Sequence, residues 1–240
     1  MTPQEAIVRR RSVRQYVDTP LAPSVREEIL SYTDIGRPLF QELPFRAVFL
    51  DREEVKCMTS TPWLPQDILA IYAEDSTPSR INVGYVFGLI DLYLQALGLG
   101  TCWLGVGRAK ENDKKKLDGL PLVMMMAIGY PDNLPYRQSP EEFDRHPMEE
   151  ITDRPDARLE PARLAPSAMN SQPWYFLHDK EALHVYCALR KSRRLTDYAH
   201  IDIGIALAHL AVTAPEGMTC FGTRILRCLP GYEYMLSIRI

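Results

Sequence analysis

The sequence predicts a mixed helix-and-sheet (α+β) fold built from two related halves. The chain has 240 residues, of which 46% are hydrophobic and 25% charged, the balance of an ordinary globular protein with a sizeable core. Four short segments in its first part recur in the same order in its last part. A polar, proline-rich stretch separates the two sets. We therefore expect one half at residues 1–131, a linker or arm at 132–163, and a shorter second half at 164–240.

Three of the repeated pairs are short segments of apolar and aromatic residues. They are PFRAVFL at 44–50 with PWYFL at 173–177, TCW at 101–103 with TCF at 219–221, and MMMAIG at 124–129 with MLSIR at 235–239. The members of the first pair are led by proline and are aromatic and aliphatic, which predicts buried strands. The last pair predicts that each half closes with a β-like run.

The remaining pair, INVG and IDIG, predicts a buried helix in each half. Each segment opens an apolar run that is long enough for a helix, at 85–97 and 205–214. Asn82 and Asp202 suit the N-cap positions, because their side chains can accept hydrogen bonds from free N–H groups of the first turn. The alternative is that two helix-and-strand segments share only generic apolar runs. If the repeat is real, one chain holds what a homodimer would hold with two subunits.

Composition excludes several classes of function. The net charge of −3 does not favour nucleic acid or an anionic membrane, and no apolar stretch approaches the roughly 18 residues of a membrane-spanning helix. The five cysteines form no C-x-x-C pair, which argues against a zinc site or a disulfide framework and favours a reducing cytoplasm. The histidines lack metal-ligand spacing, and neither G-x-S-x-G nor H-E-x-x-H occurs, so we expect no metal and no hydrolase site.

Residues 10–16, RRSVRQY, form the first candidate binding segment. A helix that begins near Pro3 would place Arg10 and Arg14 on one face if it continued that far. Arginine forks match phosphate oxygens in paired hydrogen bonds, and the Ser12 hydroxyl adds a donor. The alternative is a solvated basic helix end, where arginine complements the helix dipole.

Residues 164–176, LAPSAMNSQPWYF, form the second candidate segment. Pro166 and Ser167 predict a turn. Asn170 can both donate and accept hydrogen bonds, which suits the edge of a heterocycle with alternating C=O and N–H groups. The alternative is a turn and a helix cap that precede a core strand.

Residues 97–107, LGLGTCWLGVG, form the third candidate segment. Glycines permit a close approach of the backbone to a ligand. The segment lacks the G-x-G-x-x-G fingerprint and follows a helix, so it only weakly resembles a dinucleotide loop. The alternative is an ordinary helix C-terminus with Gly98 or Gly100 in the left-handed cap.

Taken together, these segments resemble the nitroreductase family. Its signature combines R-x-S-x-R near the N-terminus, A-P-S-x-x-N-x-Q-P-W, and a helix that leads into G-L-G-T-x-W followed by I-G-Y-P. In this chain the matches are Arg10–Arg14, Ala165–Trp174, Gly98–Trp103 and Ile128–Pro131. The resemblance implies an α+β, three-layer α/β/α sandwich, with a mostly antiparallel sheet in each half, helices on both faces, and FMN at the interface of two halves.

One departure from the ordinary family pattern is informative. The first half has the R-x-S-x-R segment, but its P-S-x-x-N position reads RPLFQ at 37–41. The second half has P-S-A-M-N at 166–170, but only Arg158 and Arg163 lie upstream of it. Each half keeps the part that the other lost, so the chain resembles the tandem, single-chain branch of the family, the TM nitroreductase type. We expect the halves to form an intramolecular pseudo-dimer that holds one FMN and functions as a monomer.

The resemblance implies an FMN-dependent NAD(P)H oxidoreductase. It would pass hydride from NADH or NADPH through FMN to a nitroaromatic, a quinone or a similar small acceptor. No catalytic side chain beyond the flavin is implied, because the acceptor can take its protons from water. The alternatives are a flavin-binding carrier or sensor without nicotinamide turnover, and a folded relic that binds no flavin.

Cofactor-binding residues follow from the same resemblance. Arg14 is the candidate for stabilising the negative charge of reduced FMN around N1 and the C2 carbonyl. Arg10, Ser12 and Arg137 are the candidates for the phosphate.

The ring is expected to lie against backbone and side chains from both halves. The backbone at Leu104 and Gly105 should face it near N5. The second half should contribute Pro166, Ser167 and Asn170.

Overall fold

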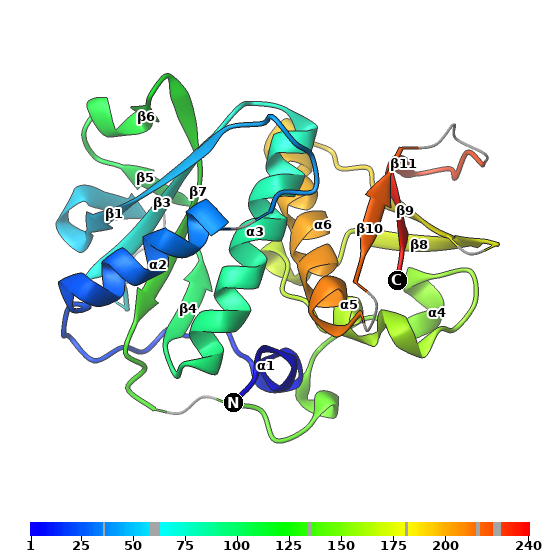
Figure 1. Cartoon of the computed structure of the whole chain (residues 1–240), viewed down its shortest axis with the longest axis horizontal. Helices are drawn as coiled ribbons and strands as arrows, with labels where there is room; N and C mark the ends of the chain where they lie inside the picture. The colour runs from blue at the N-terminus through cyan, green and yellow to red at the C-terminus, as the bar shows by residue number, and fades with distance from the viewer. Residues whose placement is uncertain (36, 58–62, 134–135, 181, 215–216, 223–226) are drawn as a thin grey trace.

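The computed structural model describes residues 1–35, 37–57, 63–133, 136–180, 182–214, 217–222 and 227–240 (Figure 1). It is a mixed helix-and-sheet structure, which confirms the predicted class. The helices are α1 (Pro3–Arg9), α2 (Pro23–Ile35), α3 (Thr77–Ala96), α4 (Met148–Ile151), α5 (Glu160–Arg163) and α6 (Arg193–Thr213). The strands are β1 (Phe45–Asp51), β2 (Val55–Cys57), β3 (Asp67–Ala73), β4 (Gly100–Trp103), β5 (Gly107–Ala109), β6 (Lys116–Leu117), β7 (Leu120–Gly129), β8 (Trp174–Asp179), β9 (Ala182–Ala188), β10 (Thr219–Phe221) and β11 (Tyr232–Arg239).

Two antiparallel sheets have the same strand order. The first has the order β1-β3-β7-β4, with β6 paired to β7, and the second has the order β8-β9-β11-β10. In each sheet the proline-led strand lies at one edge and the closing strand is third, which confirms the strands predicted from the repeat. The second strands, β3 and β9, are not among the repeated segments, although every residue of β3 is buried.

The two long helices lie between the sheets (Figure 1). One continuous hydrophobic cluster joins residues of β3 and β7, of α3 and α6, and of β8, β9 and β11. A second cluster covers the opposite face of the first sheet, where Val55 of β2, Ala109 of β5 and Leu117 of β6 contribute. In the described residues that face is covered by short strands and loops. The resulting order is sheet, helices, sheet, so the helices expected on both faces of the first sheet are not seen there.

The repeated INVG and IDIG segments meet at the crossing of α3 and α6. A Cβ atom at Gly84 would overlap the carbonyl oxygen of Ile201, and a Cβ atom at Gly204 would overlap the carbonyl oxygen of Ile81. The contact is reciprocal, because equivalent residues of the two segments exchange roles. Only glycine allows two helix backbones to approach so closely.

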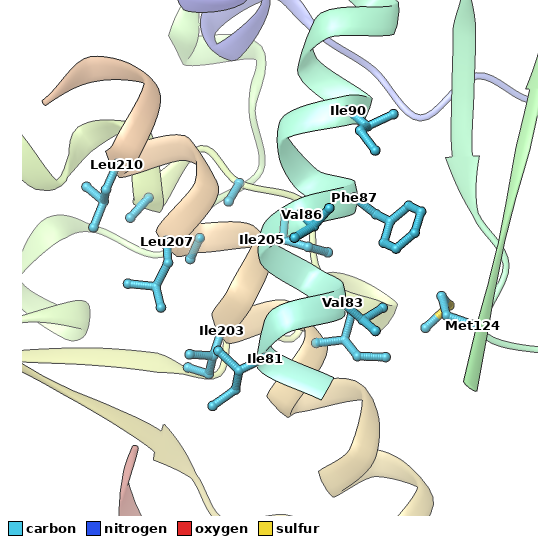
Figure 2. Close-up of a cluster of buried hydrophobic side chains, with 14 of the residues drawn as sticks. Ile81, Val83, Val86, Phe87, Ile90, Met124, Ile203, Ile205, Leu207 and Leu210 are labelled. Carbon is cyan, nitrogen blue, oxygen red and sulfur yellow. The ribbon is translucent and has the colours of Figure 1, made fainter. Parts of the chain in front are cut away.

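Apolar side chains continue the contact on both sides of this crossing (Figure 2). Phe87 of α3 points toward the first sheet, where Met124 of β7 lies, while Leu207 and Leu210 of α6 lie on the other side of the helix pair. All four side chains are buried. The helix pair is therefore the common core of both halves.

The predicted N-caps of both long helices are wrong. The N-caps are Ser76 and Ser192, whose side chains accept hydrogen bonds from the backbone N–H groups of Ser79 and Leu195. Asn82 and Asp202 lie inside the helices, each more than one turn beyond the start. Both helices begin upstream of their apolar runs. Serine caps a helix about as well as asparagine or aspartate does, so an earlier serine can serve as the N-cap.

The first helix also ends earlier than the phosphate hypothesis assumed. It stops at Arg9, and Arg10 has extended backbone torsions (φ −62°, ψ 150°). The chain then runs beside β4, where Val13 N–H donates to the Thr101 carbonyl. Arg10 and Arg14 therefore do not share a helix face, and an extended backbone presents them instead.

The proline-rich arm is folded onto the second half. Except for residues 134–135, which lie outside the described part of the chain, it contains the short helices α4 and α5 and two 3-10 turns (Pro140–Glu142 and Ala157–Leu159). A parallel bridge joins Thr152 to Phe176 of β8. The arm is thus a surface layer with buried anchors, among them Phe143 and Leu159. Among the described residues, the structure contains no helix with the length and hydrophobicity that a membrane crossing requires.

The glycine crossing predicts a large effect of one methyl group. Gly84→Ala should destabilise the fold by about 3 kcal/mol or more, because the new Cβ has to push two helix backbones apart. The free energy of unfolding from denaturant titration measures it. Gly222→Ala is the matched control, since its Cβ would meet no atom of the described residues within 4 Å. Equal stability of the two variants would contradict the close crossing.

Candidate functional site

A small cavity lies where the three candidate segments meet, and we call it the inner cavity. Its volume is about 120 Å³. The N-terminal segment contributes Ser12 and Arg14, the glycine-rich turn contributes Gly105, and the second half contributes Pro166 and Ser167. The structure therefore brings five of the predicted cofactor-binding residues into one cavity that is lined by both halves.

The apolar part of the inner cavity comes from the long helix of the second half and from the first sheet. Ile201 and Ile205 of α6 line it together with Met124 and Trp103. Met169 lies at its mouth and is 77% exposed, although it is apolar. A flat apolar ligand would cover this side chain, which is otherwise costly to expose.

A second, more open cavity of about 680 Å³ adjoins the first, and we call it the outer cavity. It shares Ser12, Arg14, Pro166, Ser167 and Met169 with the inner cavity. Its other lining residues are Arg10, Arg11, Arg137, Glu142, Asp144, Arg145 and Asn170. Five arginines against two acids make it a site for an anion.

Arg10 forms the floor of the outer cavity and is fully buried. Its Nη2 donates to Asp91 of α3 over 3.4 Å, and its Nε has no partner in the structure. The Asp91 carboxylate also accepts from Gln95 and Trp103. Burial by itself would raise the pKa of Asp91, but the Arg10 charge and these hydrogen bonds hold it below its ordinary value. Arg10 is therefore partly committed to the fold and keeps one N–H group for a ligand.

Arg137 and Arg145 carry positive charge that the fold does not neutralise. Burial, followed by repulsion from neighbouring arginines, lowers the pKa of each guanidinium to about 10. Arg137 lies over the Phe143 ring at 3.9 Å, and the Nε of Arg145 has no hydrogen-bond partner among the described residues. Such mutual repulsion is relieved by a bound anion. Arg145 was not identified from the sequence, because a single arginine in a polar arm has no local signature.

Arg14 is the freest of these cations. It is exposed, it lines both cavities, and no hydrogen bond or ion pair of its guanidinium is found within the described ranges. Its guanidinium carbon lies over the Trp63 ring, 6.0 Å from the ring centroid. It is available to an anionic atom of a ligand in either cavity.

The loop from Pro166 to Gln172 is held in a strained shape. Met169, Asn170 and Gln172 have positive φ angles of 53°, 56° and 42°, a region that is unfavourable for residues with a Cβ. The Ser167 hydroxyl accepts from the Gln172 N–H at 2.9 Å. Both carboxylate oxygens of Asp202 accept from the Ala168 N–H at 3.1 Å. These bonds present the predicted turn to both cavities.

The predicted role of Asn170 is not visible in its contacts. Its Oδ1 accepts from Arg145 over 2.7 Å, and its Nδ2 donates to the Asp144 carbonyl over 2.9 Å. It lines the outer cavity rather than the inner one. Contact between Asn170 and a heterocycle therefore remains a prediction.

The glycine-rich turn both caps a helix and lines the site. Gly98 has φ 89°, so it supplies the left-handed cap that was one of the two alternatives. The Leu104 N–H is bound to the Met125 carbonyl, and the Gly105 carbonyl accepts from the hydroxyl of Tyr198 of α6. Gly105 lines the inner cavity, whereas Leu104 lines only a neighbouring one. Tyr198, which the sequence did not indicate, separates the two.

The neighbouring cavity, which we call the side cavity, has a volume of about 400 Å³. It shares Gly105, Met124 and Tyr198 with the inner cavity. Its charged lining residues are Arg80, Arg108, Lys115 and Arg194 against Asp75 and Asp197. The balance of charge favours an anionic ligand here too.

Comparison with known proteins agrees with the geometry. Residues 3–214 match the model of the family described as "Putative TM nitroreductase". The crystal structure of a "putative nitroreductase" from Thermotoga maritima superposes with a TM-score of 0.67 at 22% identity, covering 100% of this chain and 94% of that one. Its likeness shows that the fold is shared.

Two structures from Clostridium difficile are more distant. A nitroreductase family protein has 18% identity and a TM-score of 0.49, covering 63% of this chain and 96% of that one. An FMN-dependent nitroreductase has 17% identity and a TM-score of 0.46, covering 60% and 98%. No curated protein matches this chain.

The buried Arg10–Asp91 pair predicts a strong effect of removing one charge. Asp91→Asn should destabilise the fold by about 3–5 kcal/mol, because it leaves the Arg10 guanidinium buried without a counter-charge. Asp118→Asn is the control, since it breaks an exposed pair with Arg46 that is worth about 0–1 kcal/mol. Chemical denaturation at neutral pH measures both, and a similar small loss in each would contradict the buried pair.

Proposed function

The chain belongs to the nitroreductase family matched by its residues 3–214, and we propose that it is an FMN-dependent NAD(P)H oxidoreductase. It would pass reducing equivalents to a nitroaromatic, a quinone or a similar small acceptor. The observation that carries the proposal is the continuity of the inner and outer cavities, which joins an apolar slot to a cluster of arginines. Bound FMN would supply the hydride chemistry at this site.

The residues that are present fit such a cofactor. The outer cavity has the charge for a phosphate, with unpartnered Nε atoms on Arg10 and Arg145 and a lowered pKa on Arg137. The Ser12 hydroxyl lies between the two cavities. The inner cavity has the apolar walls and the close backbone at Gly105 that a flat ring requires. Arg14 adds a cation at the junction, as suits a ring that gains negative charge on reduction.

We also propose that the two halves, 1–131 and 164–240, form an intramolecular pseudo-dimer with a single site. The shared strand order of the sheets and the reciprocal Gly84–Gly204 crossing support it. Equivalent residues of the two long helices also bind a loop backbone in each half. Asn82 holds the Phe40 backbone, as Asp202 holds the Ala168 backbone. Complete lining of the inner cavity by one chain supports function as a monomer, for which we propose a cytoplasmic setting.

NADH or NADPH is the proposed electron donor. The side cavity supports it, because this basic chamber adjoins the inner cavity at Gly105 and Tyr198. A dinucleotide carries a pyrophosphate, and guanidinium groups bind phosphate oxygens in paired hydrogen bonds. The nicotinamide would then lie next to the flavin while its phosphates lie among the arginines.

Comparing FMN with riboflavin tests the assignment of the arginines. Arg137→Ala should weaken FMN binding about tenfold or more and leave riboflavin binding unchanged, because only FMN has the phosphate. Arg14→Ala should weaken both, because this residue also lines the inner cavity. Fluorescence titration measures the affinities, with Arg46→Ala as a surface control. If Arg137→Ala weakened riboflavin as much as FMN, the outer cavity would not be the phosphate site.

Colour and reduction test the function itself. The purified protein should be yellow and release close to one FMN per chain on denaturation, and anaerobic NADPH or NADH should bleach it. Flavin binding should not depend on protein concentration, since one chain completes the site. A protein that holds flavin but resists both nicotinamides would be a carrier or sensor. Two flavins per chain would contradict the single site, and none would contradict the proposal.

A further inference from the structure

Asp202 is a buried acid on the wall of the inner cavity. Its residue is 4% exposed, and the hydrogen-bond donor that the structure gives it is the Ala168 N–H, at 3.1 Å from each oxygen. In the described part of the chain no arginine, lysine or histidine forms an ion pair with it. An ionised carboxylate in such a place is strongly unfavourable.

The equivalent position in the first half shows that an acid is not needed to bind the loop backbone. Asn82 occupies the equivalent position on α3, where its Oδ1 accepts from the Phe40 N–H at 2.9 Å and its Nδ2 donates to the Phe40 carbonyl at 2.8 Å. An amide therefore makes the contact at no cost in buried charge. The acid occurs in the half where this position lines the inner cavity.

The surroundings of Asp202 favour its neutral form. The charged and titratable groups that line the same cavity are Arg14, Cys102 and Tyr198. Those on neighbouring elements that interact electrostatically with it are Cys187 on β9 and Arg190 before α6. Burial dominates over the hydrogen bond from Ala168 and the charge of Arg190, and it raises the pKa of Asp202 to about 8. A group of this kind holds a proton at neutral pH and releases it readily to a stronger base.

We propose that Asp202 is the proton donor of the inner cavity, which delivers its carboxyl proton to the electron acceptor bound there. The proposal rests on the proposed oxidoreductase function, which supplies the hydride. A quinone that receives a hydride becomes a hydroquinone monoanion, and one proton completes the hydroquinone. The O–H bond of the Asp202 carboxyl breaks as the second O–H bond of the product forms, and the carboxylate then recovers a proton from solvent. The acceptor therefore need not take this proton directly from water.

Asp202→Asn is the decisive variant, because it keeps an acceptor for the Ala168 N–H, as Asn82 does for Phe40, and removes the proton. With a simple quinone as acceptor, the variant should reduce the quinone about 100-fold more slowly than the wild type does. Anaerobic reduction of the flavin by NADPH should stay unchanged. The rate at which the wild type reduces the quinone should fall as the pH rises through about 8, and the variant should not show this fall. Asn82→Asp is the matched control, which adds an acid in the other half and should leave the acceptor rate unchanged.

Stability provides a readout that needs no turnover. The pKa of Asp202 in the folded state is raised above its value of about 4 in the unfolded chain. The stability due to neutral Asp202 is therefore fully present below about pH 4 and is lost as the pH rises through about 8. Unfolding experiments across this range should show that loss in the wild type, and Asp202→Asn should reduce it. If the variant does not fold, the wild-type acceptor rate alone decides, since a flat profile between about pH 6 and 9 overturns the proposal.

The outcomes separate this proposal from the function on which it rests. An Asp202→Asn protein with the wild-type rate and pH profile overturns the proton-donor role and leaves the oxidoreductase function standing. A wild-type protein that no nicotinamide bleaches overturns both. Loss of flavin reduction together with acceptor reduction in the variant also overturns the role, because it would show a general defect of the site.

Discussion

The backbone crossing of α3 and α6 at Gly84 and Gly204 is the contact on which the rest of the structure depends. Because neither residue has a Cβ, the two helices touch along their backbones, and each sheet can pack on its own helix while sharing one core with the other sheet. The positions that flank the glycines are then fixed in space as well. Ile201 and Ile205 of α6 and Met124 of the first sheet all line the inner cavity.

Polar groups at this crossing connect the core to one loop in each half. Asn82 and Asp202 lie two residues before the glycines, and from there each side chain reaches the backbone of a loop in its own half. The loop of the second half has three residues with positive φ, a strained shape that needs such external bonds. The geometry of the site is therefore set by helix packing more than by the local preference of the loop.

Positive charge is concentrated around the outer cavity at a cost to stability. Asp91 offsets part of it by pairing with Arg10. Burial, followed by repulsion from neighbouring arginines, still lowers the pKa values of Arg137 and Arg145. A fold optimised only for stability would not place these groups together. The arrangement is what an anion-binding site requires, since the ligand supplies the missing negative charge.

The sequence by itself determined the local elements and the chemical types at the site. Proline-led apolar runs and a glycine after an apolar helix have short-range signatures, so strands β1 and β8 and the Gly98 cap were predictable. The shared cavity of Ser12 and Ser167 was expected only from the family resemblance of their two segments. Only the tertiary structure decided which of these side chains are buried or paired and which are available to a ligand. The burial of Arg10 on Asp91, the approach of Arg145 and the burial of Asp202 without an ion pair among the described residues depend on contacts between residues far apart in the chain. Such contacts leave no local pattern, because burial and charge pairing are properties of the packed core.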